Sequence, residues 1–249
     1  MIESFEGKTY IVTGASSGIG RAVCIELSRQ KANVVLVARS EERLNDTLAK
    51  MEAGNHQLIS FNLSYIEKIN EMVADVYEKY EKIDGIIYCA GFISHSTLKK
   101  TTYESLHSMM LINYYAFVEL IRCVMNKKPK NHPFRIVGLS SAASVAATEN
   151  FVGYSAAKAA MESSSRVLAV ELRKKNTTIN TIRLAYVDTE MLEIYNDFFE
   201  DFDAQLRRTV QPLGLIDSCD VAKMTLYLLS DSAKSITGMN IPINGGMVF

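Results

Sequence analysis

Three residues that can take part in proton transfer stand at a spacing that would bring them together. Tyr154 and Lys158 are four positions apart, and Ser141 lies thirteen positions before the tyrosine. The alanine-rich surroundings of the pair favour a helix, and residues four apart lie on one face of a helix. The phenol of Tyr154 and the ammonium group of Lys158 can therefore point into one pocket.

Such a pair could supply a proton donor at neutral pH. A free tyrosine has a pKa of about 10, and lowering it to about 7 requires roughly 4 kcal/mol of preferential stabilisation of the phenolate. A cation about 4–5 Å away, at an effective dielectric constant of about 20, supplies roughly that amount. We therefore expect Lys158 to lower the pKa of Tyr154. The alternative is a chance pair on a helix surface, because this spacing is common.

The composition is that of an ordinary globular protein. The chain has 249 residues, of which 48% are hydrophobic and 22% charged, and its net charge is −1. This length fits one large α/β domain over residues 1–249 better than two small domains. A near-neutral chain without a basic patch or tail argues against a nucleic acid or an anionic membrane as partner.

The sequence shows no targeting, membrane or metal signal. The longest apolar stretch, residues 109–121, is interrupted by Asn113 and Glu119, and we expect it to be too short to span a membrane. The N-terminus is charged and has no apolar signal core, which predicts a cytoplasmic protein. The four cysteines and four histidines are scattered, so we expect free thiols and no metal site.

Short apolar segments alternate with helical segments along the chain. The expected strands are residues 8–13, 33–38, 58–63, 83–88, 135–139, 178–184 and 239–243. The expected helices are residues 21–31, 41–51, 66–80, 103–125, 154–175 and 218–229. This alternation predicts an α/β fold with a parallel sheet and helices on both of its faces.

A glycine-rich loop, Gly14-Ala15-Ser16-Ser17-Gly18-Ile19-Gly20, joins the first expected strand to the first helix. This arrangement is typical of sites that hold the pyrophosphate of a dinucleotide. We expect Gly14 to permit the tight turn, Gly18 to let the backbone approach the phosphates, and Gly20 to let the helix lie close to the strand. The helix N-terminus would then offer free N–H groups to the anion. A purely structural turn is the alternative.

Taken together, these motifs resemble the short-chain dehydrogenase/reductase family. The resemblance rests on Thr13-Gly14-x-x-x-Gly18-x-Gly20, Ser141, Tyr154, Lys158 and Asn244-Gly245-Gly246. It covers essentially the whole chain and implies a single-domain, Rossmann-like, doubly wound sheet with NAD(P)-dependent carbonyl or alcohol chemistry. Pro212-Leu213-Gly214 and Ile236-Thr237-Gly238 are similar to the branch that contains the 3-oxoacyl-(acyl-carrier-protein) reductases.

The resemblance implies a role for each polar residue of the site. Tyr154 would protonate the carbonyl oxygen, Lys158 would also hold the nicotinamide ribose, and Ser141 would hydrogen-bond the substrate oxygen. Ser140 is the alternative to Ser141, but the thirteen-residue offset to the tyrosine matches the family at Ser141. Asn113 matches the fourth catalytic position, which anchors a water near Lys158. Alternatively, Asn113 only needs a buried partner within an apolar helix.

The residues after the second strand predict which dinucleotide binds. A carboxylate there would indicate NAD, because it hydrogen-bonds the adenosine ribose. This chain has Ala38 at that place, followed by Arg39 and Ser40, with Arg43 one helical turn further on. Arginine and a hydroxyl group suit a phosphate, so we predict NADP(H). The alternative is that Arg39 is only a solvated surface residue.

The resemblance implies further cofactor contacts at Ser16, Ser17, Ile19, Asn62, Leu63, Ala90, Gly91, Val187 and Thr189. Two motifs depart from the family. Tyr88-Cys89 replaces an Asn-Asn pair whose asparagine usually ties strands together, and Leu184-Ala185 replaces a Pro-Gly pair. The second change alters the backbone freedom beneath the nicotinamide.

Residues 190–211 form the expected substrate lid. Tyr195, Phe198, Phe199 and Phe202 have helical spacing and could line one face. Packing of this helix on the body or on another subunit is the alternative.

The function expected from these observations is the NADPH-dependent reduction of a ketone to a secondary alcohol, or the reverse. The resemblance implies a homotetramer or homodimer formed through the helices that carry Asn113 and Tyr154. Two alternatives are a catalytically weak NADP(H)-binding sensor or scaffold, and an epimerase or dehydratase.

Overall fold

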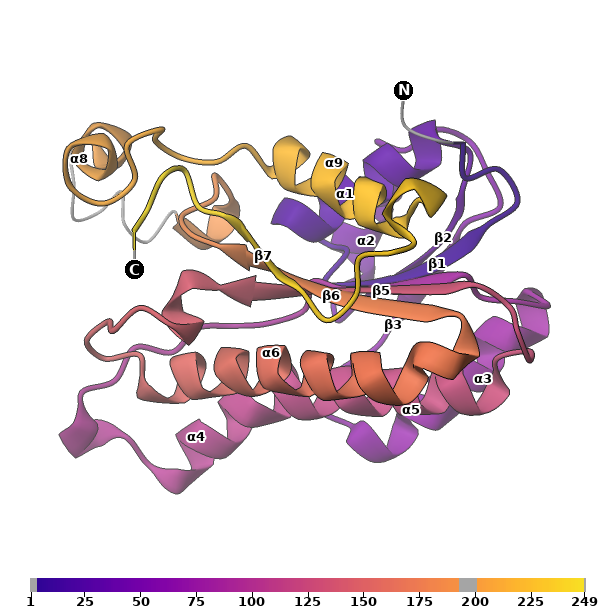
Figure 1. The fold of residues 1–249 in the computed structure, drawn as a ribbon, viewed down its shortest axis with the longest axis horizontal. Coiled ribbons are helices and arrows are strands. Elements are labelled where there is room, and N and C mark those ends of the chain that lie inside the picture. Colours follow the sequence, from indigo (N-terminus) through magenta and orange to yellow (C-terminus); the bar gives the residue numbers. More distant parts are fainter. Residues whose placement is uncertain (1–3, 193–200, 249) are drawn as a thin grey trace.

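A seven-stranded parallel sheet forms the centre of the molecule in the computed structural model, which describes residues 4–192 and 201–248 (Figure 1). The strand order is β3-β2-β1-β4-β5-β6-β7. The strands are β1 (Thr9–Thr13), β2 (Asn33–Ala38), β3 (Gln57–Ser60), β4 (Gly85–Tyr88), β5 (Phe134–Ser141), β6 (Thr177–Leu184) and β7 (Asn240–Ile243). This confirms the predicted doubly wound α/β fold.

Helices cover both faces of the sheet (Figure 1). One layer contains α1 (Gly18–Arg29), α2 (Glu41–Leu48) and α9 (Ser218–Leu229). The other contains α3 (Ile69–Lys79), α4 (Tyr103–Met110), α5 (Ala116–Lys127) and α6 (Val152–Leu172). Alternate residues of a strand face opposite layers, so Ile11 of β1 lies in one hydrophobic cluster and Val12 in the other. Strands buried on both faces explain the continuous apolar runs in the sequence.

The winding of the sheet reverses at β1. The chain first adds β2 and β3 on one side of β1, then crosses over so that β4 pairs with its other side. Loops that leave β1 and β4 therefore diverge, and a crevice opens at the carboxyl ends of the strands. The register pairs Thr13 with Tyr88 and Ser141 with Leu184, so the loops that follow these strands share one edge.

The helix expected over residues 103–125 contains a π-helical segment, Leu111–Tyr115, between α4 and α5. Asn113 lies at its centre, and its Nδ2 donates to the carbonyl oxygen of Met109, four residues earlier, at 3.0 Å. This side-chain bond competes for a carbonyl that the helical ladder of an α-helix would use. Single π turns of this kind occur often at functional sites.

Among the described residues, the helix Tyr103–Lys127 has 25 residues and is long and apolar enough to cross a membrane by length and composition. The expectation that this stretch is too short is therefore wrong, because α4, the π segment and α5 are continuous. Core helices meet the same criterion. Here Phe117, Leu120 and Val124 of this helix pack in the hydrophobic cluster beneath the sheet.

Candidate active site

Ser141, Tyr154 and Lys158 line one cavity of about 470 Å³ at the carboxyl edge of the sheet. Ser141 ends β5, and the other two residues lie one turn apart at the start of α6. Tyr154 and Lys158 are buried, and the Nζ of Lys158 lies 5.7 Å from the centroid of the Tyr154 ring. The fold thus brings together the three residues that the sequence singled out.

The pKa of Tyr154 differs from the expected direction. Burial raises the pKa of this phenol to about 12, and a hydrogen bond with Ser141 only partly opposes the effect. The expectation of a Tyr154 pKa lowered toward about 7 is therefore wrong for this structure. The physical reason is that loss of water around a buried phenolate outweighs the hydrogen bond with Ser141. Tyr154 holds its proton at neutral pH.

The ammonium group of Lys158 is hydrogen-bonded to the backbone of β5. Its Nζ donates to the carbonyl oxygen of Leu139 at 2.8 Å. Burial lowers the pKa of Lys158 to about 8, while Cys89 and Glu162 partly oppose this shift. A lysine with this pKa still carries its charge at pH 7, so the cavity contains one buried cation beside a neutral phenol.

The two adjacent serines at the end of β5 have different partners. The hydroxyl of Ser140 is buried and donates to Oε1 of Glu162 at 2.8 Å. The Ser141 oxygen accepts from the N–H of Ala143 at 3.2 Å and hydrogen-bonds with Tyr154. Since Ser140 is engaged in the interior, Ser141 is the serine placed to meet a substrate.

Glu162 is a site residue that sequence reasoning missed. One turn after Lys158, its buried carboxylate accepts from Ser144 at 2.8 Å and pairs with Arg183 of β6 at 2.6 Å. This network joins α6, β5 and β6 behind Ser141 and Lys158. A glutamate on the i+4 position from Lys158 was a visible signal, because that position lies on the buried face of the helix.

Asn113 presents an unpaired acceptor toward Lys158. Its Nδ2 donates to the carbonyl oxygens of Phe92 and Met109, whereas Oδ1 is buried and has no partner among the described residues. A Cβ added at Gly91 would lie 2.6 Å from this Oδ1 and 3.5 Å from the Nζ of Lys158. Gly91 therefore keeps open the space between the two polar groups, which suits a water or a ligand hydroxyl.

The glycine loop adopts the geometry that a dinucleotide site needs. Gly14 has φ +66°, and a Cβ there would lie 2.9 Å from the backbone nitrogen of Ala90. A Cβ at Gly20 would lie 2.1 Å from the carbonyl oxygen of Gly14, so only glycine lets α1 approach β1 this closely. The N-cap residue Ser17 makes no side-chain cap, which leaves N–H groups at the start of α1 open to another acceptor.

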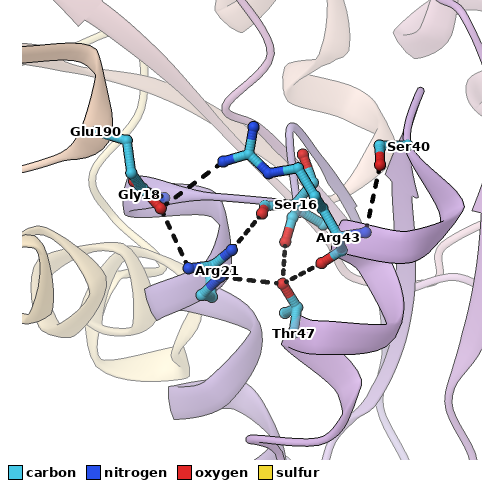
Figure 2. A network of polar contacts seen from close by, with 8 residues as sticks. Ser16, Gly18, Arg21, Ser40, Arg43, Thr47 and Glu190 are labelled. Carbon is cyan, nitrogen blue, oxygen red and sulfur yellow. Dashed lines mark hydrogen bonds and ion pairs between the residues drawn. The ribbon is translucent and has the colours of Figure 1, made fainter. Parts of the chain in front are cut away.

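A carboxylate binds at this helix N-terminus (Figure 2). Oε2 of Glu190 accepts from the N–H of Gly18 at 2.9 Å, and Oε1 lies 3.1 Å from Nη1 of Arg21. Arg43 of α2 lies 3.8 Å from the same Oε1. The start of α1 thus binds an anionic group in this structure, as expected for a phosphate site.

The residues expected at the adenosine end lie beside one another at the ends of β2 and β3. The exposed side chain of Arg39 has no hydrogen-bond or ion-pair partner within residues 4–192 and 201–248. Ser40 caps α2, because its hydroxyl oxygen accepts from the N–H of Arg43 at 3.3 Å. The Oδ1 of Asn62 accepts from the N–H of Ser64 at 3.1 Å, and Leu63 is buried in the core.

The first altered motif has a structural substitute for the missing asparagine. Tyr88 is fully buried, packs edge-on against Phe117, and its hydroxyl donates to the carbonyl oxygen of Ile112 at 2.6 Å. It therefore joins β4 to the π segment next to Asn113. The hydroxyl of Thr13 accepts from the N–H of Ala90 at 3.2 Å and joins β1 to the same loop.

The residue that follows the second altered motif, Tyr186, is held by a glutamine from another segment. The buried side chain of Gln211 accepts from the N–H of Tyr186 at 3.0 Å and donates to the carbonyl oxygens of Tyr186 and Gly214. Val187 lies buried beyond this clamp, and the hydroxyl of Thr189 donates to its carbonyl oxygen. This role of Gln211 could not be predicted from the sequence, because it depends on a contact between segments that are separated along the chain.

The expected lid is described only in part. Residues 190–192 form a short 3₁₀ turn and α8 spans Phe202–Thr209, while Tyr195, Phe198 and Phe199 lie outside the described residues. Phe202 packs edge-on against Tyr186, with ring centroids 5.5 Å apart. For this one aromatic residue the structure shows contact with the body of the protein.

The described residues of the site show neither a metal-ligand cluster nor an ionised thiol. No group of three potential metal ligands occurs among the residues that the structure describes. Cys89 lines the cavity, but burial raises its pKa to about 12, so the thiol is neutral at physiological pH. A neutral thiol is a poor nucleophile.

Fold and site together define a class of protein. A helix that begins directly after a glycine loop, at the point where the sheet reverses, is the arrangement of dinucleotide-binding α/β proteins. The unpaired Oδ1 of Asn113 and the space kept open by Gly91 add a polar place for a bound group beside Lys158. These observations fit a nicotinamide dinucleotide, with Lys158, the glycine loop and Arg39 as the residues that would hold it.

Comparison with known proteins specifies the family. Residues 14–248 match the family model described as enoyl-(acyl carrier protein) reductase. The chain therefore belongs to the short-chain dehydrogenase/reductase family of oxidoreductases, which confirms the resemblance seen in the sequence.

Individual relatives are similar over nearly their whole length. The chain is 29% identical over 245 residues to a 3-oxoacyl-(acyl-carrier-protein) reductase of Rickettsia conorii, covering 97% of each chain. It is 28% identical over 247 residues to the reductase of that name from Escherichia coli, covering 98% of each. A solved short-chain dehydrogenase/reductase (glucose/ribitol dehydrogenase) from Brucella melitensis superposes with a TM-score of 0.91 at 26% identity, covering all of both chains.

Proposed function

We propose that this protein is an NADPH-dependent reductase that converts a ketone into a secondary alcohol, with Tyr154 as the proton donor. The observation that carries the proposal is the single cavity lined by Ser141, Tyr154 and Lys158, beside the glycine loop and Asn113. The relatives named 3-oxoacyl-(acyl-carrier-protein) reductase support this class of substrate.

In the proposed mechanism the bound dinucleotide supplies a hydride to the carbonyl carbon. Ser141 hydrogen-bonds the carbonyl oxygen and stabilises the negative charge that develops there. Tyr154 transfers its phenolic proton to that oxygen. An alkoxide is a stronger base than a phenolate, so this transfer is favourable even from a phenol whose pKa is raised by burial.

Lys158 would act on Tyr154 and on the proton supply. Its charge stabilises the phenolate once the proton has left, and its remaining N–H groups would hold the nicotinamide ribose. Asn113, with its unpaired Oδ1, would hold a water through which the proton is replaced. At neutral pH Tyr154 keeps its proton, so it is in the protonation state that reduction requires.

NADP(H) is favoured over NAD(H) by the residues at the end of β2. Ala38 offers no carboxylate to repel a phosphate, and the exposed Arg39 with Ser40 beside it can bind one. Proposed contacts of the same cofactor are the backbone of Ser16, Ser17, Ile19, Ala90, Gly91 and Val187, the side chains of Asn62 and Thr189, and the apolar surface of Leu63.

We also propose that the protein is a single domain, that it is cytoplasmic, and that it forms a homotetramer or homodimer. The catalytically weak sensor is not favoured, because the relatives are named as reductases and because Ser141, Tyr154 and Lys158 line one cavity.

The decisive experiment measures NADPH oxidation with a panel of ketones, ketosugars and 3-oxoacyl thioesters. Tyr154→Phe should lower kcat by at least about a hundredfold, because a positioned general acid contributes about 10²–10⁴-fold, while NADPH affinity changes little. Turnover that is unaffected by Tyr154→Phe would contradict the mechanism. Tight NADPH binding without turnover on any substrate would favour the sensor.

A further inference from the structure

Glu190 reaches across the site from the segment after β6 to the glycine loop (Figure 2). Its carboxylate accepts the N–H of Gly18 at 2.9 Å and lies 3.1 Å from Arg21 and 3.8 Å from Arg43. One carboxylate thus binds a backbone donor at the start of α1 together with two cations. Helix N-termini and arginine pairs are the groups with which proteins bind phosphate.

A phosphate cannot use these donors while Glu190 holds them. Gly18 has a single N–H, and Glu190 already occupies it. Thr189 also covers the loop, since a Cβ at Gly18 would lie 3.1 Å from Cγ2 of Thr189. Glu190 must therefore leave before an anion from outside can bind the N–H of Gly18.

The anion site itself is built independently of Glu190. Nη2 of Arg21 donates to the carbonyl oxygen of Ser16 at 2.6 Å, and Nε donates to the hydroxyl of Thr47 at 3.2 Å. The Thr47 hydroxyl in turn donates to the carbonyl oxygen of Ala15 at 2.9 Å. Because these bonds fix Arg21 from within its own layer, the site keeps its shape when the carboxylate leaves.

The Glu190 carboxylate is also exposed enough to be displaced. Its side chain is 38% exposed, and those of its partners Arg21 and Arg43 are 20% and 48% exposed. Ion pairs at such exposure contribute little to stability, so exchange for a doubly charged pyrophosphate with more acceptor oxygens is feasible.

We propose that Glu190 is a built-in competitor for the phosphate site of the dinucleotide. In the cofactor-free protein it occupies the glycine loop, and the cofactor binds only to the fraction of molecules in which Glu190 has left. The apparent affinity is reduced by that fraction. Because the carboxylate is tethered, it also returns at a high effective concentration and favours release of the spent cofactor. The identity of the displaced anion as NADP(H) rests on the proposed function.

The test compares Glu190→Gln with Asp188→Asn by calorimetric titration of the full chain with NADPH and, separately, with inorganic pyrophosphate. Asp188 is an exposed acid two positions away on the same segment, so its variant removes the same charge without altering the contact at Gly18. Glu190→Gln should bind both ligands about three- to tenfold more tightly than wild type. Asp188→Asn should change either affinity by less than about twofold.

Equal or weaker binding of pyrophosphate by Glu190→Gln would overturn the proposal, as would an equal gain in Asp188→Asn. Using two ligands distinguishes a failure of the Glu190 proposal from a failure of the proposed function. If wild type binds NADPH but Glu190→Gln binds it no more tightly, the proposal that Glu190 competes with the cofactor is refuted and the proposed reductase function is unaffected. If pyrophosphate binding improves in Glu190→Gln but neither protein binds NADPH, the role of Glu190 as a competitor is supported and NADPH is refuted as the cofactor.

Discussion

At the scale of single residues, burial decides the protonation of the catalytic pair. Tyr154 and Lys158 are both buried, and burial disfavours the charged form of each. The pKa of the phenol therefore rises to about 12 and that of the ammonium group falls to about 8. At neutral pH the tyrosine therefore keeps its proton. The lysine is still charged there, but its pKa lies only about one unit above neutral pH.

The lowered pKa of Lys158 predicts a pH-dependent stability. Between about pH 8 and the usual lysine value of 10.5, the unfolded chain binds more protons than the folded protein, so stability rises with pH in this window. We expect wild type to gain about 2–3 kcal/mol relative to Lys158→Met between about pH 7 and about pH 10. Urea denaturation of the cofactor-free proteins measures this. A constant difference across the range would contradict the burial of a charged lysine.

Arg39 predicts the cofactor preference. Arg39→Glu should weaken NADPH binding by about tenfold or more and NADH binding far less, because only NADPH carries the additional phosphate. Fluorescence titration with each cofactor measures both constants. Lys50→Glu reverses the charge of another exposed cation just after α2 and serves as the control. Equal losses for the two cofactors in Arg39→Glu would refute the assignment.

At the scale of the elements, the loops after β4 and β6, where the two altered motifs lie, are held by hydrogen bonds from other segments of the chain. Tyr88 connects β4 with the π segment, and Gln211 binds the backbone on both sides of Tyr186. Glu162 joins α6 to β5 and β6 behind Ser141. The loss of Asn-Asn and Pro-Gly is therefore accompanied by other ties at the same places.

The Gln211 clamp gives a prediction on stability. Gln211→Ala leaves buried backbone groups of Tyr186 and Gly214 without partners, and each such group costs about 1–3 kcal/mol. We expect the free energy of unfolding to fall by about 2–4 kcal/mol in urea denaturation. Gln205→Ala, on the exposed side of α8, should change it by less than about 0.5 kcal/mol. A similar small effect of both variants would show that the clamp contributes nothing.

At the scale of the whole molecule, an exposed apolar surface on α5 and α6 supports self-association. A shallow groove between these helices is lined by Tyr114, Val118, Ser163, Ser164, Val167 and Leu168. Val167 and Val170 on α6 are 55% and 57% exposed. Exposed apolar residues gathered on one face often mark an interface, and a long helix pair presents such a face to a second copy.

This surface predicts the effect of a charge on assembly. Val167→Lys should shift the protein from a tetramer or dimer to a smaller species, because a lysine in an apolar interface loses its hydration. Light scattering after size-exclusion chromatography measures the mass. Val210→Lys places the same charge on an exposed valine after α8 and should leave the mass unchanged. A monomeric wild type would refute the proposed assembly.

The sequence by itself determined the fold and singled out the candidate catalytic residues that the fold brings to one cavity. Apolar strands and helical segments alternate in a pattern that only a parallel α/β sheet can bury, and α9 begins and ends at the expected residues 218 and 229. The glycine loop was equally readable, since Gly14 and Gly20 occupy positions where a side chain does not fit. These features depend on local geometry and on the periodicity of burial.

Only the tertiary structure decided how the site is tuned. The direction of the Tyr154 pKa depends on how much water the fold removes, which no spacing reveals. The contact of Glu190 with Gly18 joins residues 172 positions apart, and the Gln211 clamp likewise joins remote loops. Tyr154 and Lys158 were recognisable because a helix sets their spacing. Their protonation, and the competitor at the glycine loop, follow from burial and from contacts between distant segments.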